Sequence, residues 1–215
     1  MKRIATVFAC ALVVGGFQAH KAEAQTIGFK LGQSWSKLDV DPQDQDETLD
    51  QLSAFGGGGF IRFGFAGLAL QAEVLALTKG TKEEDEAGAG DAELKLEYIE
   101  VPITAMFSLG NGPYVFAGPT FAFETGCELE SSDGSTEVPC ESDTDPDAIN
   151  RKKLDIGLTG GLVFQFPVGP GSILVEGRYT HGLTNLNDSA TSDTQKIRNR
   201  SFAAFAGYAI PIGGR

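Results

Sequence analysis

The stretch from Phe55 to Lys79 reads FGGGGFIRFGFAGLALQAEVLALTK, and it contains two strand-like segments that fold back on each other at Ala66-Gly67. With these two residues as the turn, apolar side chains pair across one face of a hairpin: Phe65 with Leu68, Phe63 with Leu70 and Ile61 with Ala72. The other face pairs Arg62 with Gln71 and places Glu73 diagonal to Arg62. The stretch therefore predicts a hairpin with one apolar and one polar face.

Two folds accommodate such a hairpin. In a soluble sandwich or barrel the apolar face would be the interior, whereas in a small membrane β-barrel the apolar face would meet lipid and the polar face would line the lumen. The polar face also carries Gly56, Gly58 and Gly64. Small residues fit a narrow and crowded lumen, so the membrane barrel competes with the soluble fold, and the rest of the chain decides between them.

Eight segments of the chain alternate apolar and polar residues in the manner of half-buried strands. They are residues 26–35, 55–65, 68–79, 94–107, 114–126, 154–166, 173–183 and 197–212. The odd-numbered connections between them are long and polar, and the even-numbered ones are short and rich in Gly and Pro, which is typical of membrane barrels. We therefore predict an all-β chain that forms an eight-stranded antiparallel up-and-down transmembrane β-barrel. Within residues 114–126, Pro119 cannot donate a ladder hydrogen bond and predicts a β-bulge.

The N-terminus reads as a secretory signal peptide, residues 1–24. Lys2 and Arg3 supply the positive end, an apolar run follows, and Ala22-Glu23-Ala24 is a small-x-small cleavage site. Removing the three cations and one anion of this segment changes the formal net charge from −12 to about −14. The mature domain, residues 25–215, contains no apolar run long enough for a transmembrane helix.

Acidic residues concentrate in stretches between the predicted strands: Asp39–Asp50, Glu83–Glu93, Glu128–Asp147 and Asp188–Asp193. No twelve-residue calcium loop is present, so we expect solvated loops and no specific metal site, with divalent-cation binding by the acidic loops as the alternative. The longest stretch contains Cys127 and Cys140. In an exported protein this pair predicts a disulfide, with two free thiols as the alternative.

Seven charged residues fall on the polar, inward faces of the predicted strands: Lys30, Arg62, Glu73, Glu100, Asp155, Glu176 and Arg178. An eight-stranded barrel has room for side chains and little else, so these groups should form a paired ionic plug. An ion or proton pathway is the alternative. In the membrane barrel, Arg62→Leu should cost several kcal/mol because it strips partners from buried acids, whereas in a soluble barrel it should be mild.

Aromatic residues lie near several predicted strand ends, as expected for side chains at membrane interfaces; they are Trp35, Tyr98, Tyr114, Tyr179 and Tyr208. Arg198 and Arg200, near the start of the last strand, are candidates for contact with lipopolysaccharide phosphates or for simple solvated rim charges.

Catalysis finds little support in the sequence. His181 is the one histidine that remains after signal removal, and no nucleophile elbow, metal-spaced His/Cys set or phosphate loop is present. We expect no enzyme activity, no cofactor and no nucleic-acid partner, with a barrel enzyme that uses rim side chains as the alternative.

Six phrases of the chain, in order, carry a family resemblance: Leu70–Gly80, Leu96–Ile103, Pro113–Pro119, Leu154–Phe166, Glu176–Leu186 and Asn199–Ile212. With them the chain resembles the small outer-membrane β-barrel domain family, the porin-family or PorT-type barrels, which are related in architecture to OmpA/OmpX-type barrels. The resemblance implies a monomer in the bacterial outer membrane, surrounded by lipid and lipopolysaccharide and delivered by periplasmic chaperones and the barrel-assembly machinery. It implies no catalytic residues. The chain departs from the family by ending in Ile212-Gly213-Gly214-Arg215 instead of an aromatic residue.

These observations lead to one expected function and two alternatives. The expected function is a non-enzymatic outer-membrane barrel, structural, adhesive or receptor-like, with acidic extracellular loops and a charge-plugged interior. The first alternative is a narrow porin-like channel or transport-associated barrel. The second is a secreted, soluble, lipocalin-like barrel that binds an apolar ligand.

Overall fold

The computed structural model describes residues 24–41, 49–65, 67–83, 92–110, 113–131, 137–139, 153–186 and 196–212. Its strands are β1 (Ala24–Asp41), β2 (Leu49–Phe65), β3 (Leu68–Glu83), β4 (Ala92–Ser108), β5 (Tyr114–Ser131), β6 (Glu137–Pro139), β7 (Leu154–Val168), β8 (Gly171–Gly182) and β9 (Lys196–Pro211). Within these ranges there is no helix that is long and apolar enough to cross a membrane.

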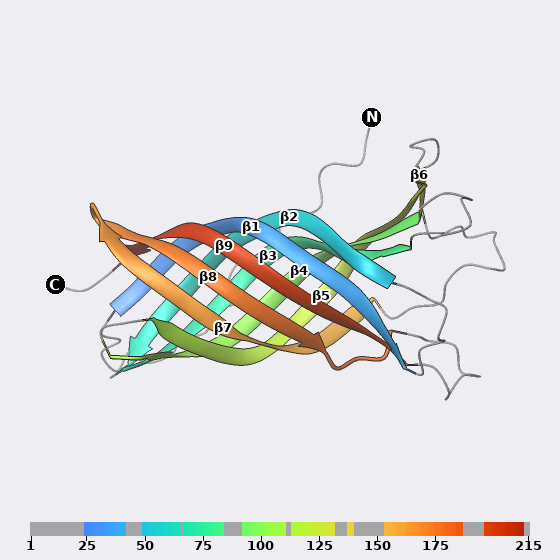
Figure 1. Ribbon diagram of the computed structural model, residues 1–215. Helices are drawn as coiled ribbons and strands as arrows, with labels where there is room; N and C mark the ends of the chain where they lie inside the picture. Colours follow the sequence, from blue (N-terminus) through green and yellow to red (C-terminus); the bar gives the residue numbers. More distant parts are fainter. Residues whose placement is uncertain are drawn as a thin grey trace.

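Eight strands close into an antiparallel barrel (Figure 1). Each pairs with the next in the order β1, β2, β3, β4, β5, β7, β8 and β9, and β9 returns to pair with β1 from Pro211 opposite Thr26 to Lys196 opposite Asp41. The predicted eight-stranded barrel is therefore confirmed. The additional strand β6 pairs only with residues 128–130 of β5 and extends beyond the barrel body in Figure 1. It was not predicted, because three residues show no periodicity.

The hairpin that decides the fold has the predicted register. Phe65 lies opposite Leu68, Ile61 opposite Ala72 and Arg62 opposite Gln71. Gly67 in the turn has a φ of 87°, a conformation that glycine adopts without steric cost. The short connections at residues 66–67, 109–113 and 169–170 share one end of the barrel, which we call the turn end, and the opposite end is the loop end.

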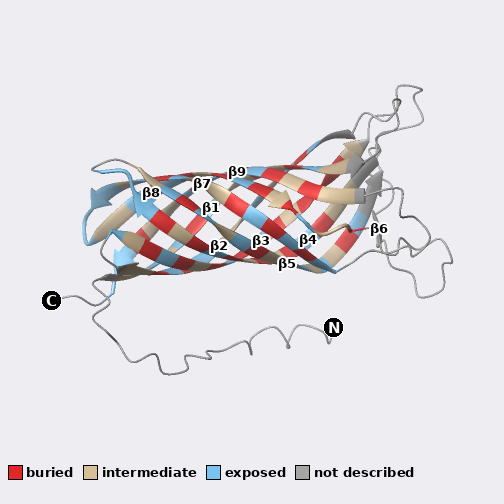
Figure 2. Cartoon of the chain, turned by 90° about the horizontal axis from the view of Figure 1, so that it is seen from below, coloured by how far each residue is buried: buried red, intermediate tan, exposed pale blue. Residues whose placement is uncertain are grey.

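The outer wall of the barrel is apolar, and the seven charged residues predicted to face inward are buried inside. Along the eight barrel strands, inward and outward residues differ in burial, as the banding in Figure 2 shows. In the deciding hairpin, Ile61 and Leu70 are 36% and 45% exposed, whereas Arg62 and Glu73 are 8% and 1% exposed. A soluble barrel would show the reverse, so the structure contradicts the lipocalin-like alternative.

Several strands are longer than predicted, mainly at the loop end. β1 continues to Asp41 and β5 to Ser131, into stretches that the sequence indicated as acidic loops. The ladder between β3 and β4 likewise continues to Glu83 opposite Ala92, because backbone hydrogen bonds form regardless of side-chain polarity.

The predicted bulge at Pro119 is wrong. The ladder between β5 and β7 runs through Pro119, opposite Leu158, without a change of register. Toward β4 the pairing is interrupted between Thr120 and Ala117 and resumes in the same register, so the missing N–H is accommodated without an extra residue. The register shift of this strand pair lies instead at Glu97/Tyr98.

The bore is filled at the turn end by an apolar cluster to which seven of the strands contribute. Its members are buried, and Tyr114 packs against them; we call this set the turn-end cluster: Phe60, Ala69, Met106, Phe116, Val163, Leu174 and Ala209. Tyr98 is also buried inside the barrel, so of the five aromatic residues named above, Tyr98 is not at a membrane interface.

Glycines 56–59 let β2 approach its neighbours closely. The ladder between β2 and β3 shifts register between Gln51 and Gly57, and beyond that shift Gly58 pairs with Leu75. A Cβ atom on Gly58 would run into the carbonyl oxygen of Val74, whereas the nearest atom to a Cβ on Gly59 would be the carbonyl oxygen of Gly28, 3.6 Å away. The two neighbouring glycines therefore differ in what they tolerate.

We predict that Gly58→Ala destabilises the barrel by about 1–3 kcal/mol, because the added methyl group forces β2 away from β3. The matched control Gly59→Ala should change stability by about 0.5 kcal/mol or less, since the nearest atom to its methyl group lies at an ordinary van der Waals distance. Urea unfolding in lipid vesicles, followed by the gel migration of unboiled samples, measures both. Equal stabilities of the two variants would contradict the prediction.

Candidate functional site: the buried charge ring

Four charged side chains meet inside the barrel and alternate in sign. Lys30 Nζ lies 2.8 Å from Glu73 Oε2 and 2.8 Å from Glu176 Oε2. Arg178 Nη2 lies 2.8 Å from Glu73 Oε1 and 2.8 Å from Glu176 Oε1. Each cation thus contacts both carboxylates, and we call Lys30, Glu73, Glu176 and Arg178 the charge ring.

The ring crosses the bore. Its residues come from β1, β3 and β8, and β3 and β8 are not neighbours in the barrel wall. All four occupy inward positions of the strand alternation, and each is almost completely buried. Two positive and two negative charges in one closed set satisfy each other, which is the condition for keeping charge in a dry interior.

Aromatic rings cover the two cations of the ring. Lys30 Nζ lies 5.2 Å from the centroid of the Phe205 ring, and the Arg178 guanidinium carbon lies 5.4 Å from that of Phe116 and 5.6 Å from that of Phe205. These are cation–π distances. The rings add attraction for the cations and exclude water from the ion pairs.

Arg62 joins the ring indirectly. Its Nε donates to Gln71 Oε1 at 2.8 Å, and Gln71 Nε2 donates to Glu73 Oε1 at 2.7 Å. The side-chain amide of Gln165 lies against the same guanidinium group. Within the described ranges Arg62 therefore has amide partners and no ion pair, which revises the expectation that Arg62→Leu would strip partners from buried acids.

Glu100 belongs to a separate ion pair nearer the loop end. Its Oε2 lies 2.6 Å from Lys79 Nζ, both side chains are buried, and Lys79 Nζ lies 5.4 Å from the Tyr98 ring centroid. Lys79 was not predicted as an interior charge, because it is the last residue of its predicted strand. The odd-numbered alternation through Gln71 and Glu73 would have found it.

Asp155 is buried on β7, but no ion pair joins it to the ring in the described part of the chain. Its Oδ1 has no hydrogen-bond partner among those residues. Of the seven predicted interior charges, the structure thus gathers four in the ring, attaches Arg62 through Gln71, and leaves Glu100 and Asp155 apart from it.

We predict that Arg178→Leu destabilises the folded barrel by about 3–5 kcal/mol, because it leaves Glu73 and Glu176 to share one cation. Arg62→Leu serves as the matched comparison and should cost only about 1–2 kcal/mol, since it removes hydrogen bonds to amides. Urea unfolding in vesicles measures the difference.

The double variant Arg178→Leu/Glu73→Gln keeps a neutral Lys30–Glu176 pair. It should therefore recover a large part of the stability that Arg178→Leu loses. If the double variant were less stable than the single one, charge balance would not be what the ring contributes.

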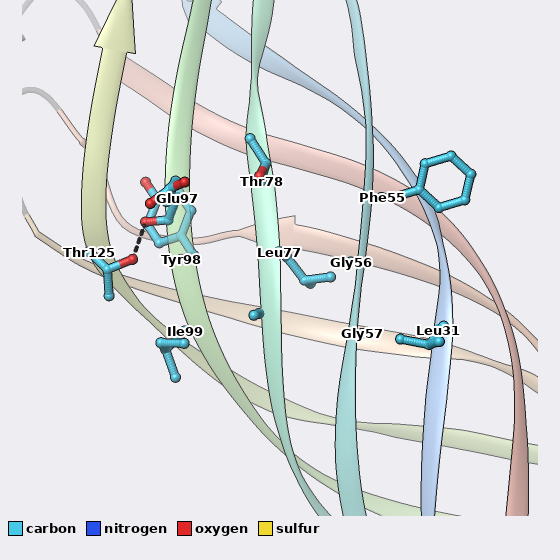
Figure 3. Close-up of a pocket in the computed structure, with 11 residues that line it drawn as sticks. Leu31, Phe55, Gly56, Gly57, Leu77, Thr78, Glu97, Tyr98, Ile99 and Thr125 are labelled. Atoms are coloured by element: carbon cyan, nitrogen blue, oxygen red, sulfur yellow. Dashed lines mark hydrogen bonds between the residues drawn. The ribbon is translucent and has the colours of Figure 1, made fainter. Parts of the chain in front are cut away.

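A groove of about 660 Å³ lies on the outer wall across β1 to β5. Figure 3 shows Leu31 and Phe55 on one side of it and Glu97 and Thr125 on the other, with the Thr125 hydroxyl donating to the Glu97 carbonyl oxygen at 3.3 Å. Gly56 and Gly57 contribute no side chains between them, which leaves the space open. The groove is lined mainly by lipid-facing residues and gathers no catalytic set.

Groups suited to metal binding or catalysis are scarce in the described ranges. They contain no cluster of three or more His, Cys, Asp or Glu residues that could hold a metal ion. His181 is half-buried at an outward position of β8, beside Arg200 of β9. Cys127 is buried on β5, whereas Cys140 lies outside the described residues, so the disulfide stays a prediction.

The family model described as "Outer membrane protein beta-barrel domain" matches residues 19–188 of this chain, most of its length. The chain belongs to this family. Together with the closed barrel and its apolar outer wall, the match places the protein in the bacterial outer membrane. Outer-membrane barrels typically have short periplasmic turns, which predicts that the loop end faces outward. The predicted signal peptide lies outside the described residues except for Ala24, the first residue of β1.

Solved structures share the fold at low sequence identity. Ail of Yersinia pestis is 14% identical with a TM-score of 0.44, covering 87% of this chain and 99% of its own. Neisserial surface protein A is 11% identical with a TM-score of 0.46, covering 84% and 95%. The outer membrane protease OmpT of Escherichia coli is 14% identical with a TM-score of 0.49, covering 89% and 98%. These likenesses are too distant to assign a function, and no curated protein matches the sequence significantly.

Proposed function

We propose that this protein is a non-enzymatic, closed outer-membrane barrel whose work is structural, adhesive or receptor-like and is carried out by its external loops. The observation that carries the proposal is the filled bore. The charge ring spans the interior, and the turn-end cluster occupies it further toward the periplasm. A solute would have to break buried ion pairs and then cross packed apolar side chains, which costs several kcal/mol.

A narrow channel is the second candidate, and one observation favours it. Several buried polar atoms have no hydrogen-bond partner in the described part of the chain, including Thr104 Oγ1, Thr120 Oγ1 and Asp155 Oδ1. Such groups suit an interior that contains water. The charge ring and the turn-end cluster support the closed barrel over the channel, because both would interrupt a water path.

A protease-like activity has weaker support. The sequence identity to the outer membrane protease OmpT is too low to indicate a shared activity. The carboxylates of the charge ring form ion pairs with Lys30 and Arg178. His181 lies at an outward position, away from the buried acids. These features favour a barrel without a catalytic centre.

We predict that the purified protein gives no single-channel steps in planar bilayers, because the charge ring and the turn-end cluster close the bore. Folding is verified on the same preparation by the altered gel migration of unboiled protein. The same preparation from cells that lack the gene controls for contaminating porins. Reproducible steps that are absent from this control would favour the channel.

The loop-based function predicts that surface attachment depends on loop charge. The variant Glu141→Gln/Asp143→Asn/Asp145→Asn/Asp147→Asn removes four acids from the longest acidic stretch and keeps its length and Cys140. Cells that display this variant should bind cationic surfaces or cationic proteins less than cells with the unchanged protein at equal surface amounts, because the attraction falls with the charge. Binding is measured by flow cytometry. If both kinds of cell bind equally, these four acids do not contribute to adhesion.

A further inference from the structure

Two rows of side chains cross the outer face of three adjacent strands near the loop end. Trp35 of β1 lies opposite Phe202 of β9, which lies opposite Tyr179 of β8; these three form the aromatic row. Two residues further toward the loop end, Lys37 lies opposite Arg200, which lies opposite His181; these form the basic row. The register alone places the rows one above the other on the same face.

The aromatic row marks the outer boundary of the lipid-facing wall. Below it on β1, Ile27, Phe29 and Leu31 are exposed on the outer face. Eight residues separate Ile27 from Trp35, which at about 3.3 Å per residue and a tilt of about 40° gives roughly 20 Å along the barrel axis. An apolar band of about 25 Å is typical of outer-membrane barrels, so the basic row lies at the depth of the lipid headgroups.

The charge of this region is positive, although the whole chain has a formal net charge of −12. Arg198 is the cross-strand partner of Asp39, next to the basic row. Asp39 also forms an ion pair with Arg200, with 2.5 Å between Oδ2 and Nη2. The described residues at these positions are thus three cations, Lys37, Arg198 and Arg200, and one carboxylate, Asp39.

Both arginines have donors that remain unused in the described ranges. Arg198 Nε and Arg200 Nε are shielded from solvent and have no hydrogen-bond partner there. An N–H group without a water partner forms its strongest hydrogen bond with a charged acceptor. A phosphate oxygen suits the guanidinium group in geometry and charge.

We propose that Lys37, Arg198 and Arg200 form a binding site for the phosphate group of an outer-leaflet glycolipid, whose acyl chains lie along the aromatic row. The depth of the site favours a lipid over a soluble anion, because a phosphate fixed at the membrane boundary carries apolar chains that cover the exposed Phe202 and Tyr179 rings. His181 lies in the same row and can donate a further hydrogen bond. Phosphorylated lipid A is the probe of matching chemistry.

The test measures binding of bisphosphorylated lipid A to the full-length mature protein in mild detergent by native mass spectrometry. The triple variant Lys37→Ala/Arg198→Ala/Arg200→Ala should bind lipid A at least about tenfold more weakly. Asp39→Asn should bind it more tightly, since the carboxylate that competes for Arg200 is removed. The control Lys95→Ala removes an outward cation near the loop end of β4, opposite Glu128, and should bind like the unchanged protein.

Three outcomes would overturn the proposal. The first is a triple variant that folds, as judged by gel migration, and binds lipid A with unchanged affinity. The second is equal binding of dephosphorylated lipid A, which would assign the affinity to acyl chains. The third is full competition by inorganic phosphate at the lipid concentration, which would indicate a site for free phosphate. Weaker binding by the triple variant together with tighter binding by Asp39→Asn would support the site.

Discussion

The structure depends on one electrostatic constraint, the mutual neutralisation of four charges inside a bore too narrow for water to solvate them. Lys30, Glu73, Glu176 and Arg178 each contact two partners of opposite sign, so no member is left with an unpaired charge. The partners lie on β1, β3 and β8, and Lys30 meets Glu176 only because β9 connects β1 to β8. The closed wall therefore positions the ring, and the ring in turn ties together strands that the wall does not pair.

The second constraint is that each strand has one face toward lipid and one face toward the barrel interior. A membrane barrel must offer apolar side chains to lipid at every second position and fill its interior with the remaining positions. In this chain the interior positions form layers along the axis, with the turn-end cluster at one end and the charge ring and the Lys79–Glu100 pair beyond it. This layering distinguishes a filled barrel from a pore. A partner would therefore contact only the residues of the outer wall and of the loop end.

The period-two pattern was sufficient to predict the barrel, the deciding hairpin and its register, and the inward side of the seven charges named from the sequence. It did not predict which charges meet. Alternation assigns a residue to the inside or the outside, but its depth along the axis depends on the stagger between tilted strands, which no local pattern gives. For this reason Arg62 was expected to pair with acids, although its partners are amides, and Lys79 was not recognised as an interior residue. The prediction of a bulge at Pro119 was wrong for another reason. A strand can accommodate a proline by omitting ladder hydrogen bonds, without inserting an extra residue.

The charge ring also divides along the chain in a way that bears on assembly. Lys30 and Glu73 lie on the first three strands and contact each other, while Glu176 and Arg178 lie on β8 and contact each other. Each half of the chain therefore brings one cation and one anion that are already partnered, and neither half carries net ring charge before β1 and β9 meet. Closing the seam between β1 and β9 joins these two ion pairs into one four-membered ring, so the ring residues add no net charge to the interior at that step.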